Sequence, residues 1–225
     1  PGDGATKFAD FAKVIASGKG RRTAIPAALA IPEKDWPDAA VKSLGAEYAS
    51  VAAETPFAQR DGAAFKQVLA LGEKLAARLP AAEAKALRDS LGNLDLQVVR
   101  IGTIFEKMKY NKASFSIVSG KPTKIVFVND DKMPHNLLIA APGALADLGA
   151  AADKMAADPQ GFAKHFVPDD KRVLWSTKLL QPGQTAELSF IAPKPGAYPF
   201  VCTFPLHWKL MNGTMQVMPD DSEKK

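Results

Sequence analysis

Eight short runs rich in β-branched and aromatic residues follow one another from about residue 95 onward, and no other feature limits the fold so strongly. Gly, Pro, Asn and Asp separate the runs, and these residues favour turns. Short strands at this spacing predict an antiparallel β-sandwich or barrel. The runs cover residues 96–104, 113–120, 122–130, 135–141, 172–178, 185–193, 197–204 and 213–219.

One segment interrupts the series of strands. Residues 141–170 are rich in alanine and poor in β-branched residues, a composition typical of helices. We therefore expect a helical insertion between two strands of the sandwich.

The first half of the chain has a different pattern. Alanine is dense there, and Phe65, Val68, Leu69, Leu75 and Leu79 fall on one stripe of a helix. Expected helices cover residues 6–18, 37–54, 60–80 and 80–92. We therefore expect two domains, a helical segment over residues 1–92 and a β domain over residues 93–225.

The stretch between the first two expected helices, residues 19–37, carries three prolines and is expected to be irregular. Lys19, Arg21 and Arg22 lie beside Gly18 and Gly20 at its start. We interpret this basic cluster as a solvated loop.

Composition excludes several functional classes. The 225 residues carry a net charge of +5, which favours acidic protein partners. Since no basic stripe with interleaved aromatic residues is present, nucleic-acid binding is not expected. No apolar run approaches the ~20 residues of a membrane-spanning helix. Pro1 is not an initiator methionine, so we expect a processed product or a piece of a longer protein.

The segment YPFVCTFPLHWKLMNG, residues 198–213, holds the only cysteine of the chain. Cys202, His207 and Met211 are spaced C-x4-H-x3-M, and His135 begins an apolar run upstream. One thiolate, two imidazoles and a thioether are the donor set of a type 1 copper site. Three alternatives remain. The residues could bind zinc at an N/S site, Cys202 could be a nucleophile with His207 as its base, or Cys202 could simply be buried.

The segments YPFVCTFPLHWKLMNGTM and MPHNLLI resemble the cupredoxin family, and within it the azurin- and auracyanin-like members. The resemblance covers roughly residues 95–219 and implies a mainly β, Greek-key sandwich that holds one copper ion. It implies that His135, Cys202 and His207 are the strong ligands and that Met211 is the weak axial one.

The resemblance also assigns roles to neighbours of the ligands. The backbone carbonyl of Pro134 is a possible second weak axial ligand. Asn136 is expected to tie the two ligand segments together. The backbone N–H groups of Asn136 and Phe204 are expected to donate hydrogen bonds to the thiolate, and such bonds tune the reduction potential.

One position departs from the family pattern, because Leu206 stands where the family has a glycine before the second histidine. A leucine at positive φ would be strained, so we expect the loop to have relaxed. Leu206 would then add apolar surface beside an exposed edge of His207. Met133, Pro134, Pro205, Leu206 and Trp208 are the expected docking patch for a partner.

The function implied by the resemblance is one-electron transfer with Cu(I)/Cu(II) cycling, without enzymatic turnover, in the periplasm or another extracytoplasmic space. Expected partners are redox proteins such as a c-type cytochrome or a copper or haem oxidoreductase. A copper carrier that passes the metal to a client is the alternative. A third possibility is the electron-delivery module of a larger oxidoreductase. The remaining histidine, His165, is interpreted as structural.

Overall fold

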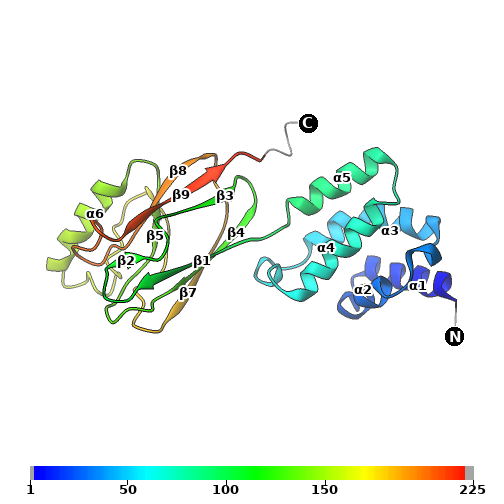
Figure 1. The fold of residues 1–225 in the computed structure, drawn as a ribbon, viewed down its shortest axis with the longest axis horizontal. Helices are drawn as coiled ribbons and strands as arrows, with labels where there is room; N and C mark the ends of the chain where they lie inside the picture. Colours follow the sequence, from blue (N-terminus) through cyan, green and yellow to red (C-terminus); the bar gives the residue numbers. More distant parts are fainter. Residues whose placement is uncertain (1–2, 221–225) are drawn as a thin grey trace. The chain divides into compact units, whose positions relative to one another are not determined.

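The computed structural model describes residues 3–220 and divides the chain into two compact units, Pro1–Leu96 and Gln97–Lys225 (Figure 1). The ends of the two expected domains, residues 1–2 and 221–225, lie outside the described residues. Each unit has its own hydrophobic core. The expected order, helices first and then a β-sandwich with a helical insertion, is confirmed.

The first unit is built of helices whose apolar stripes meet in one core. Tyr48, Phe8 and Phe65 are among its largest fully buried side chains, and the Tyr48 hydroxyl donates to the carbonyl of Val68 over 2.9 Å. A buried hydroxyl needs such a partner, because an unpaired one costs free energy. The elements are α1 (Gly4–Ser17), α2 (Arg21–Leu29), η1 (Glu33–Asp35), α3 (Asp38–Ala53), η2 (Phe57–Gln59), α4 (Ala63–Ala76) and α5 (Ala81–Gly92).

The expectation of an irregular stretch with a solvated basic loop is wrong at α2. Arg21 begins this helix, donates to the carbonyl of Ile15 over 2.7 Å and pairs with Glu54. Pro26 lies inside the helix, where a proline removes one backbone hydrogen bond. The buried face of α2, formed by Ala24, Ile25 and Ala28, outweighs that loss.

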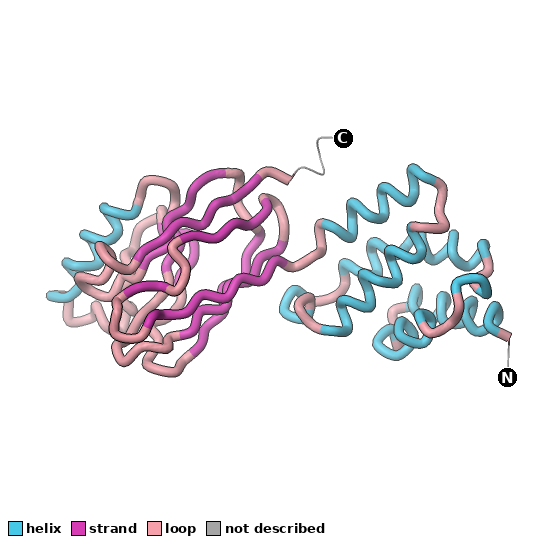
Figure 2. The backbone as a smooth tube through the Cα atoms, in the orientation of Figure 1, coloured by secondary structure: helices cyan, strands magenta, loops and turns pink. Residues whose placement is uncertain are grey.

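The second unit is a sandwich of two sheets (Figure 2). One sheet has the order β2-β1-β4-β7 and the other the order β3-β9-β8-β5-β6. All eight expected runs contain a strand, and β2 is an additional short one. The strands are β1 (Gln97–Ile104), β2 (Lys109–Tyr110), β3 (Ser114–Val118), β4 (Pro122–Val128), β5 (Leu138–Ala140), β6 (Val173–Ser176), β7 (Thr185–Ile191), β8 (Gly196–Val201) and β9 (Asn212–Met218).

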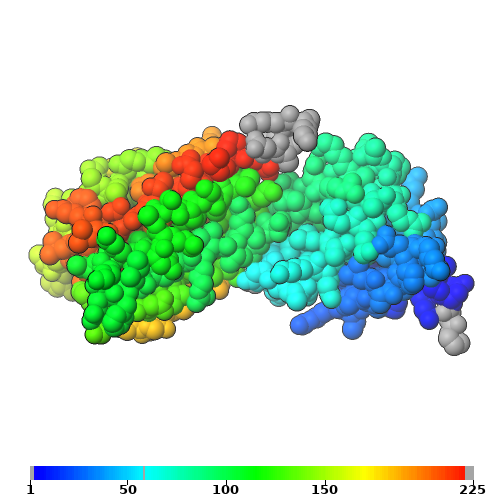
Figure 3. Space-filling model, in the orientation of Figure 1, coloured from blue at the N-terminus to red at the C-terminus, as the bar shows by residue number. Residues whose placement is uncertain are grey.

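The expected sandwich is present, but its sheets are mixed, so the expected antiparallel arrangement holds only in part. Strand β1 runs parallel to β4, and β3 runs parallel to β9. The second pair brings distant parts of the sequence together, and Figure 3 shows the red surface of β9 beside the green surface of β3. Parallel strands need long connections, and here the chain between β3 and β9 supplies both ligand segments.

The insertion contains one true helix, α6 (Leu145–Lys154), followed by the short η3 (Met155–Ala157). The rest of the expected helical segment forms turns. Leu148 of α6 is fully buried in a small cluster with Leu138 of β5 and Val201 of β8. The helix thus packs against β5, which follows His135 in the sequence, and against β8, which directly precedes Cys202.

Candidate metal centre

Strand β8 ends at Val201 and delivers Cys202, after which the chain makes a closed loop before β9. The backbone N–H of Cys202 donates to the carbonyl of Met211 over 3.0 Å, and the N–H of Met211 donates to the carbonyl of His207 over 2.8 Å. These bonds hold both ends of the C-x4-H-x3-M segment close to each other. The loop therefore presents three of the four predicted ligands together.

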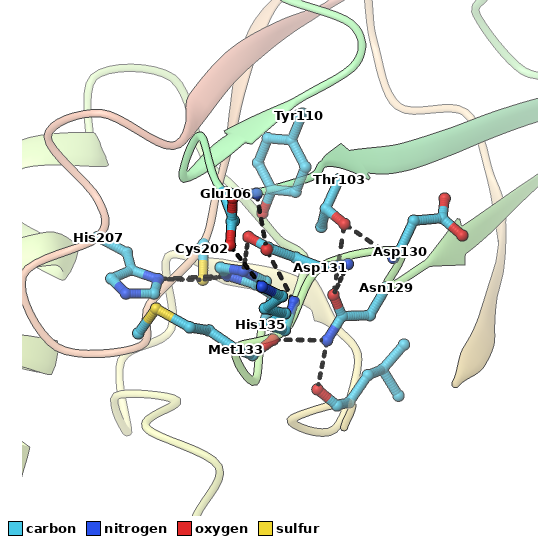
Figure 4. A network of polar contacts seen from close by, with 12 residues as sticks. Thr103, Glu106, Tyr110, Asn129, Asp130, Asp131, Met133, His135, Cys202 and His207 are labelled. Atoms are coloured by element: carbon cyan, nitrogen blue, oxygen red, sulfur yellow. Dashed lines mark hydrogen bonds and ion pairs between the residues drawn. The ribbon is translucent and has the colours of Figure 1, made fainter. Parts of the chain in front are cut away.

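The structure brings His135 to the same place from the other ligand segment (Figure 4). The sulfur of Cys202 lies 3.7 Å from Nδ1 of His135 and 3.7 Å from Nδ1 of His207, and the two Nδ1 atoms are 3.2 Å apart. A point equidistant from the corners of such a triangle lies about 2.1 Å from each, close to the lengths of metal bonds to histidine nitrogen and cysteine sulfur. The three donor atoms thus fit a single metal ion.

All four predicted ligands are buried. Cys202, His135 and Met211 are fully buried, and His207 is 3% exposed. We expected an edge of His207 to be exposed, and this expectation is wrong. The ring of Phe204 packs against the imidazole, with 4.8 Å between the ring centroids. A buried, largely apolar surrounding limits the access of water to the donor atoms.

The sulfur of Cys202 is buried next to two backbone N–H groups. Burial raises the pKa of the Cys202 thiol to about 12, although hydrogen bonds from the backbone N–H groups of Asn136 and Phe204 oppose this effect. A metal ion must therefore displace the thiol proton when it binds. The same N–H groups then remain as donors to the thiolate.

Asn136 ties the two ligand segments together. Its side-chain oxygen accepts from the N–H of Thr203 over 2.8 Å, and its amide donates to the Thr203 hydroxyl over 2.8 Å. The amide also donates to the carbonyl of His165 over 2.9 Å. His165 thus contributes its backbone to the fold of the site, which agrees with its structural interpretation.

Both histidines are held neutral. Burial lowers the pKa of His207 to about 4, helped by the proximity of His135, and burial also lowers the pKa of His135 against the opposing effect of Asp131. Neutral imidazole is the form that binds metal ions. The two imidazoles of the metal-free site are therefore already in their metal-binding form near pH 7, and only the Cys202 thiol has a proton to lose.

Leu206 has not relaxed as expected, because its φ is +70°. Helix α6 holds this strained residue in place. The carboxylate of Asp153 accepts from the backbone N–H of Leu206 over 2.6 Å and from the indole N–H of Trp208 over 2.8 Å. Asp153 therefore supports the residues on both sides of His207.

The residues of the expected docking patch differ in how far they are exposed to solvent. Leu206 is 74% exposed and Met133 is 40% exposed, whereas Pro134 and Pro205 are half-buried. The indole of Trp208 is half-buried and directed to Asp153 of α6. Pro134 directly precedes His135, and its carbonyl as an axial ligand stays a prediction.

Asp131 is a component of the site that the sequence did not reveal. Its Oδ2 lies 3.0 Å from Nε2 of His135, the ring nitrogen that faces away from Cys202 (Figure 4). The spacing D-x3-H is the only signal of this contact. The adjacent Asp130 gives an equally good sequence candidate, so spacing alone does not identify the inward-facing carboxylate.

Comparisons with known proteins agree with this geometry. Residues 97–218, more than half of the chain, match the copper binding proteins of the plastocyanin/azurin family. Auracyanin-A of Chloroflexus aurantiacus is 28% identical over 121 residues, which cover 53% of this chain and 73% of that protein. Outer membrane protein H.8 of Neisseria meningitidis is 39% identical over 88 residues, 38% of this chain and 45% of H.8.

The fold is similar to that of a solved relative. The structure of auracyanin A, described as a "blue" copper protein from Chloroflexus aurantiacus, matches with a TM-score of 0.51 and 26% identity, covering 55% of this chain and 99% of the other. The chain spans only about half the length of other curated relatives, such as 53% of auracyanin-B and 45% of H.8.

Within the described residues, no helix combines the length and the apolar character needed to cross a membrane. The expected resemblance and the expected cofactor, copper, are confirmed by the family match and by the grouping of His135, Cys202 and His207. The chain belongs, through residues 97–218, to the plastocyanin/azurin family of copper-binding proteins.

Proposed function

We propose that this protein transfers single electrons through one copper ion held by His135, Cys202, His207 and Met211. The observation that carries the proposal is the triangle of two imidazole nitrogens and one sulfur, with sides of 3.2, 3.7 and 3.7 Å. Copper at such a site supplies a one-electron Cu(I)/Cu(II) couple.

The residues of the chain prepare this site for both oxidation states. The loop is closed by hydrogen bonds between Cys202, His207 and Met211, and Asn136 holds it to the segment of His135. Because the donors are packed and hydrogen-bonded before metal binding, they move little when the charge of the ion changes. Small movement favours fast electron transfer.

An absorption and EPR titration of the full-length protein with Cu(II) tests the proposal. The wild type should develop an intense visible sulfur-to-copper charge-transfer band with narrow copper hyperfine splitting. Cys202→Ser should lose both signals, whereas Thr203→Ser, a matched change at the neighbouring residue, should keep them. A wild-type protein that stays colourless, or signals that survive in Cys202→Ser, would contradict the proposal.

Burial of the ligands also bears on the alternative of a copper carrier that hands the metal to a client. All four side chains are at most 3% exposed, which favours retention of copper over rapid exchange. We therefore prefer electron transfer. Rapid loss of Cu(I) to a competing chelator, on the time scale of mixing, would favour the carrier function instead.

We further propose that the partner docks on an apolar surface beside His207, formed by Leu206, Met133 and Pro205. Leu206 is the most exposed of the large hydrophobic residues, at 74%, although its positive φ is unfavourable for a leucine. An exposed apolar side chain kept at a conformational cost suits a contact surface.

The net charge of +5 favours a redox partner with an acidic face, such as a c-type cytochrome or a copper or haem oxidoreductase. We place the protein in an extracytoplasmic space, as an independent carrier or as the electron-delivery module of a larger redox protein. Leu206→Glu should slow electron exchange with the partner and leave the copper spectrum unchanged, and an unchanged exchange rate would contradict the docking surface.

A further inference from the structure

The carboxylate of Asp131 is buried behind His135. Asp131 is 4% exposed and His135 is fully buried, and Oδ2 of the carboxylate lies 3.0 Å from Nε2 of the imidazole. The other ring nitrogen, Nδ1, faces the sulfur of Cys202. The carboxylate and the metal position therefore lie on opposite sides of one ring.

Both oxygens of this carboxylate are fixed. Oδ1 accepts from the backbone N–H of Glu106 over 2.9 Å and from that of Lys132 over 2.8 Å. The backbone N–H of Asp131 donates to the side-chain oxygen of Asn129 over 3.1 Å. The carboxylate therefore has a defined orientation, independent of any metal ion.

The surrounding loop is shaped to make these contacts. Glu106 and Met108 have φ values of +55° and +47°, a region that costs free energy for residues other than glycine. The side chain of Asn129 fixes the adjacent turn by donating to the carbonyls of Met133 and Leu180. Figure 4 shows this network converging on Asp131 and His135.

The lysine that follows Asp131 in the sequence directs its side chain to other groups. The side chain of Lys132 pairs with Glu106 over 2.6 Å and lies over the ring of Phe105. Oδ1 of Asp131 accepts from two backbone N–H groups, and Oδ2 faces a ring nitrogen of His135. These are the contacts that a carboxylate anion makes.

We propose that Asp131 is a positioning residue that fixes the tautomer of His135 and lowers the reduction potential of the copper centre. A carboxylate can only accept, so Nε2 of His135 carries the proton and the lone pair of Nδ1 points to the metal position. The negative charge behind the ring also increases the electron donation of Nδ1 and favours Cu(II) over Cu(I). The effect on the potential rests on the proposed function, whereas the choice of tautomer does not.

Two charge-matched variants test the effect on the potential. Asp131→Asn removes one negative charge in contact with His135, and Asp130→Asn removes one at the adjacent, exposed position. Outer-shell partners of metal ligands change affinity by about tenfold or more. We expect Asp131→Asn to raise the affinity ratio for Cu(I) over Cu(II) about tenfold, which equals about 59 mV for one electron. Asp130→Asn should change the ratio less than about twofold, because exposed charges are screened.

Redox titration of the copper-loaded, full-length variants measures these shifts. Equal shifts in the two variants, or a lower potential in Asp131→Asn, would overturn the tuning role. A wild-type protein without the visible charge-transfer band would instead refute the proposed function, so the two failures are distinguishable.

The tautomer is tested in the metal-free wild type, so the test does not depend on a variant that folds. Long-range ¹H–¹⁵N NMR spectra should show His135 protonated at Nε2, with that proton protected from exchange with water. A His135 protonated at Nδ1, or an Nε2 proton that exchanges freely, would overturn the positioning role.

Discussion

Gly149 lies in α6, where its backbone faces the indole of Trp208, and it offers a sharp test of how the insertion supports the ligand loop. A methyl group at this position would lie 2.3 Å from Cδ2 and 2.5 Å from Cγ of Trp208. Non-bonded carbon atoms prefer about 3.5–4.0 Å. In Gly149→Ala the indole must therefore move by roughly 1 Å or more.

Such a movement has a calculable cost. The indole N–H of Trp208 is 2.8 Å from the carboxylate of Asp153, so the shift breaks a hydrogen bond to a charged acceptor, worth about 1.5–3 kcal/mol. Overpacking adds about 1–3 kcal/mol where the indole cannot move freely. Alanine favours the helix over glycine by about 1 kcal/mol. We expect the sandwich unit of Gly149→Ala to lose about 1.5–5 kcal/mol of unfolding free energy in total.

Urea unfolding of the metal-free, full-length protein measures this loss, with the sandwich followed by the NMR signals of its strand amides. Ala150→Gly is the matched control, because residue 150 is exposed in the same helix and reports helix propensity alone, a loss of about 1 kcal/mol. Gly149→Ala should also weaken copper retention, whereas the control should not. A gain of about 1 kcal/mol in Gly149→Ala would refute the reasoning, because the indole would then move aside at no cost.

Two further predictions concern the ligand loop. In the metal-free protein the pKa of His207 is about 4, below the unfolded value of about 6.5, so unfolding takes up a proton in this window. The unfolding free energy should fall by up to about 3 kcal/mol as the pH drops from about 6.5 to 4. Urea unfolding at several pH values measures this change. Equal stability at pH 7 and pH 4 would contradict the prediction. Leu206→Gly should stabilise the sandwich by about 0.5–1 kcal/mol by removing the strain of positive φ, while electron exchange with the partner slows. A loss of stability in the same urea assay would show that Leu206 contributes packing rather than strain.

The proposed metal ligands could be recognised in the sequence because most of them are close together in it. Cys202, His207 and Met211 lie within one loop, and the residue types alone specify a soft metal site. His135 needed the fold to join them, since it lies 67 residues before Cys202. The strands were predicted correctly for a similar reason, because each is a short run with turn residues on both sides.

The residues that support the ligands were not predictable in the same way. Asp153 contacts Leu206 and Trp208 from 53 and 55 residues away, so no local pattern connects them. The positive φ of Leu206 depends on this contact, and the expectation of a relaxed loop failed for that reason. The expectation of an irregular stretch at α2 was wrong for a different reason. Burial of the apolar face of this helix stabilises it by more than Pro26 destabilises it.

The parallel pairing of β3 with β9 also affects the order in which the molecule can be made. Strand β3 is among the first strands of the sandwich to be synthesised, whereas its partner β9 is the last strand of the described chain. The edge of β3 therefore stays unpaired while about a hundred further residues are synthesised. The helical unit, residues 1–96, has its own hydrophobic core and can fold while the sandwich is still incomplete. The ligand loop precedes β9 directly. We therefore expect copper capture to be a late event, after the last strand has closed the sheet, and nascent chains that stop before Asn212 to bind no copper.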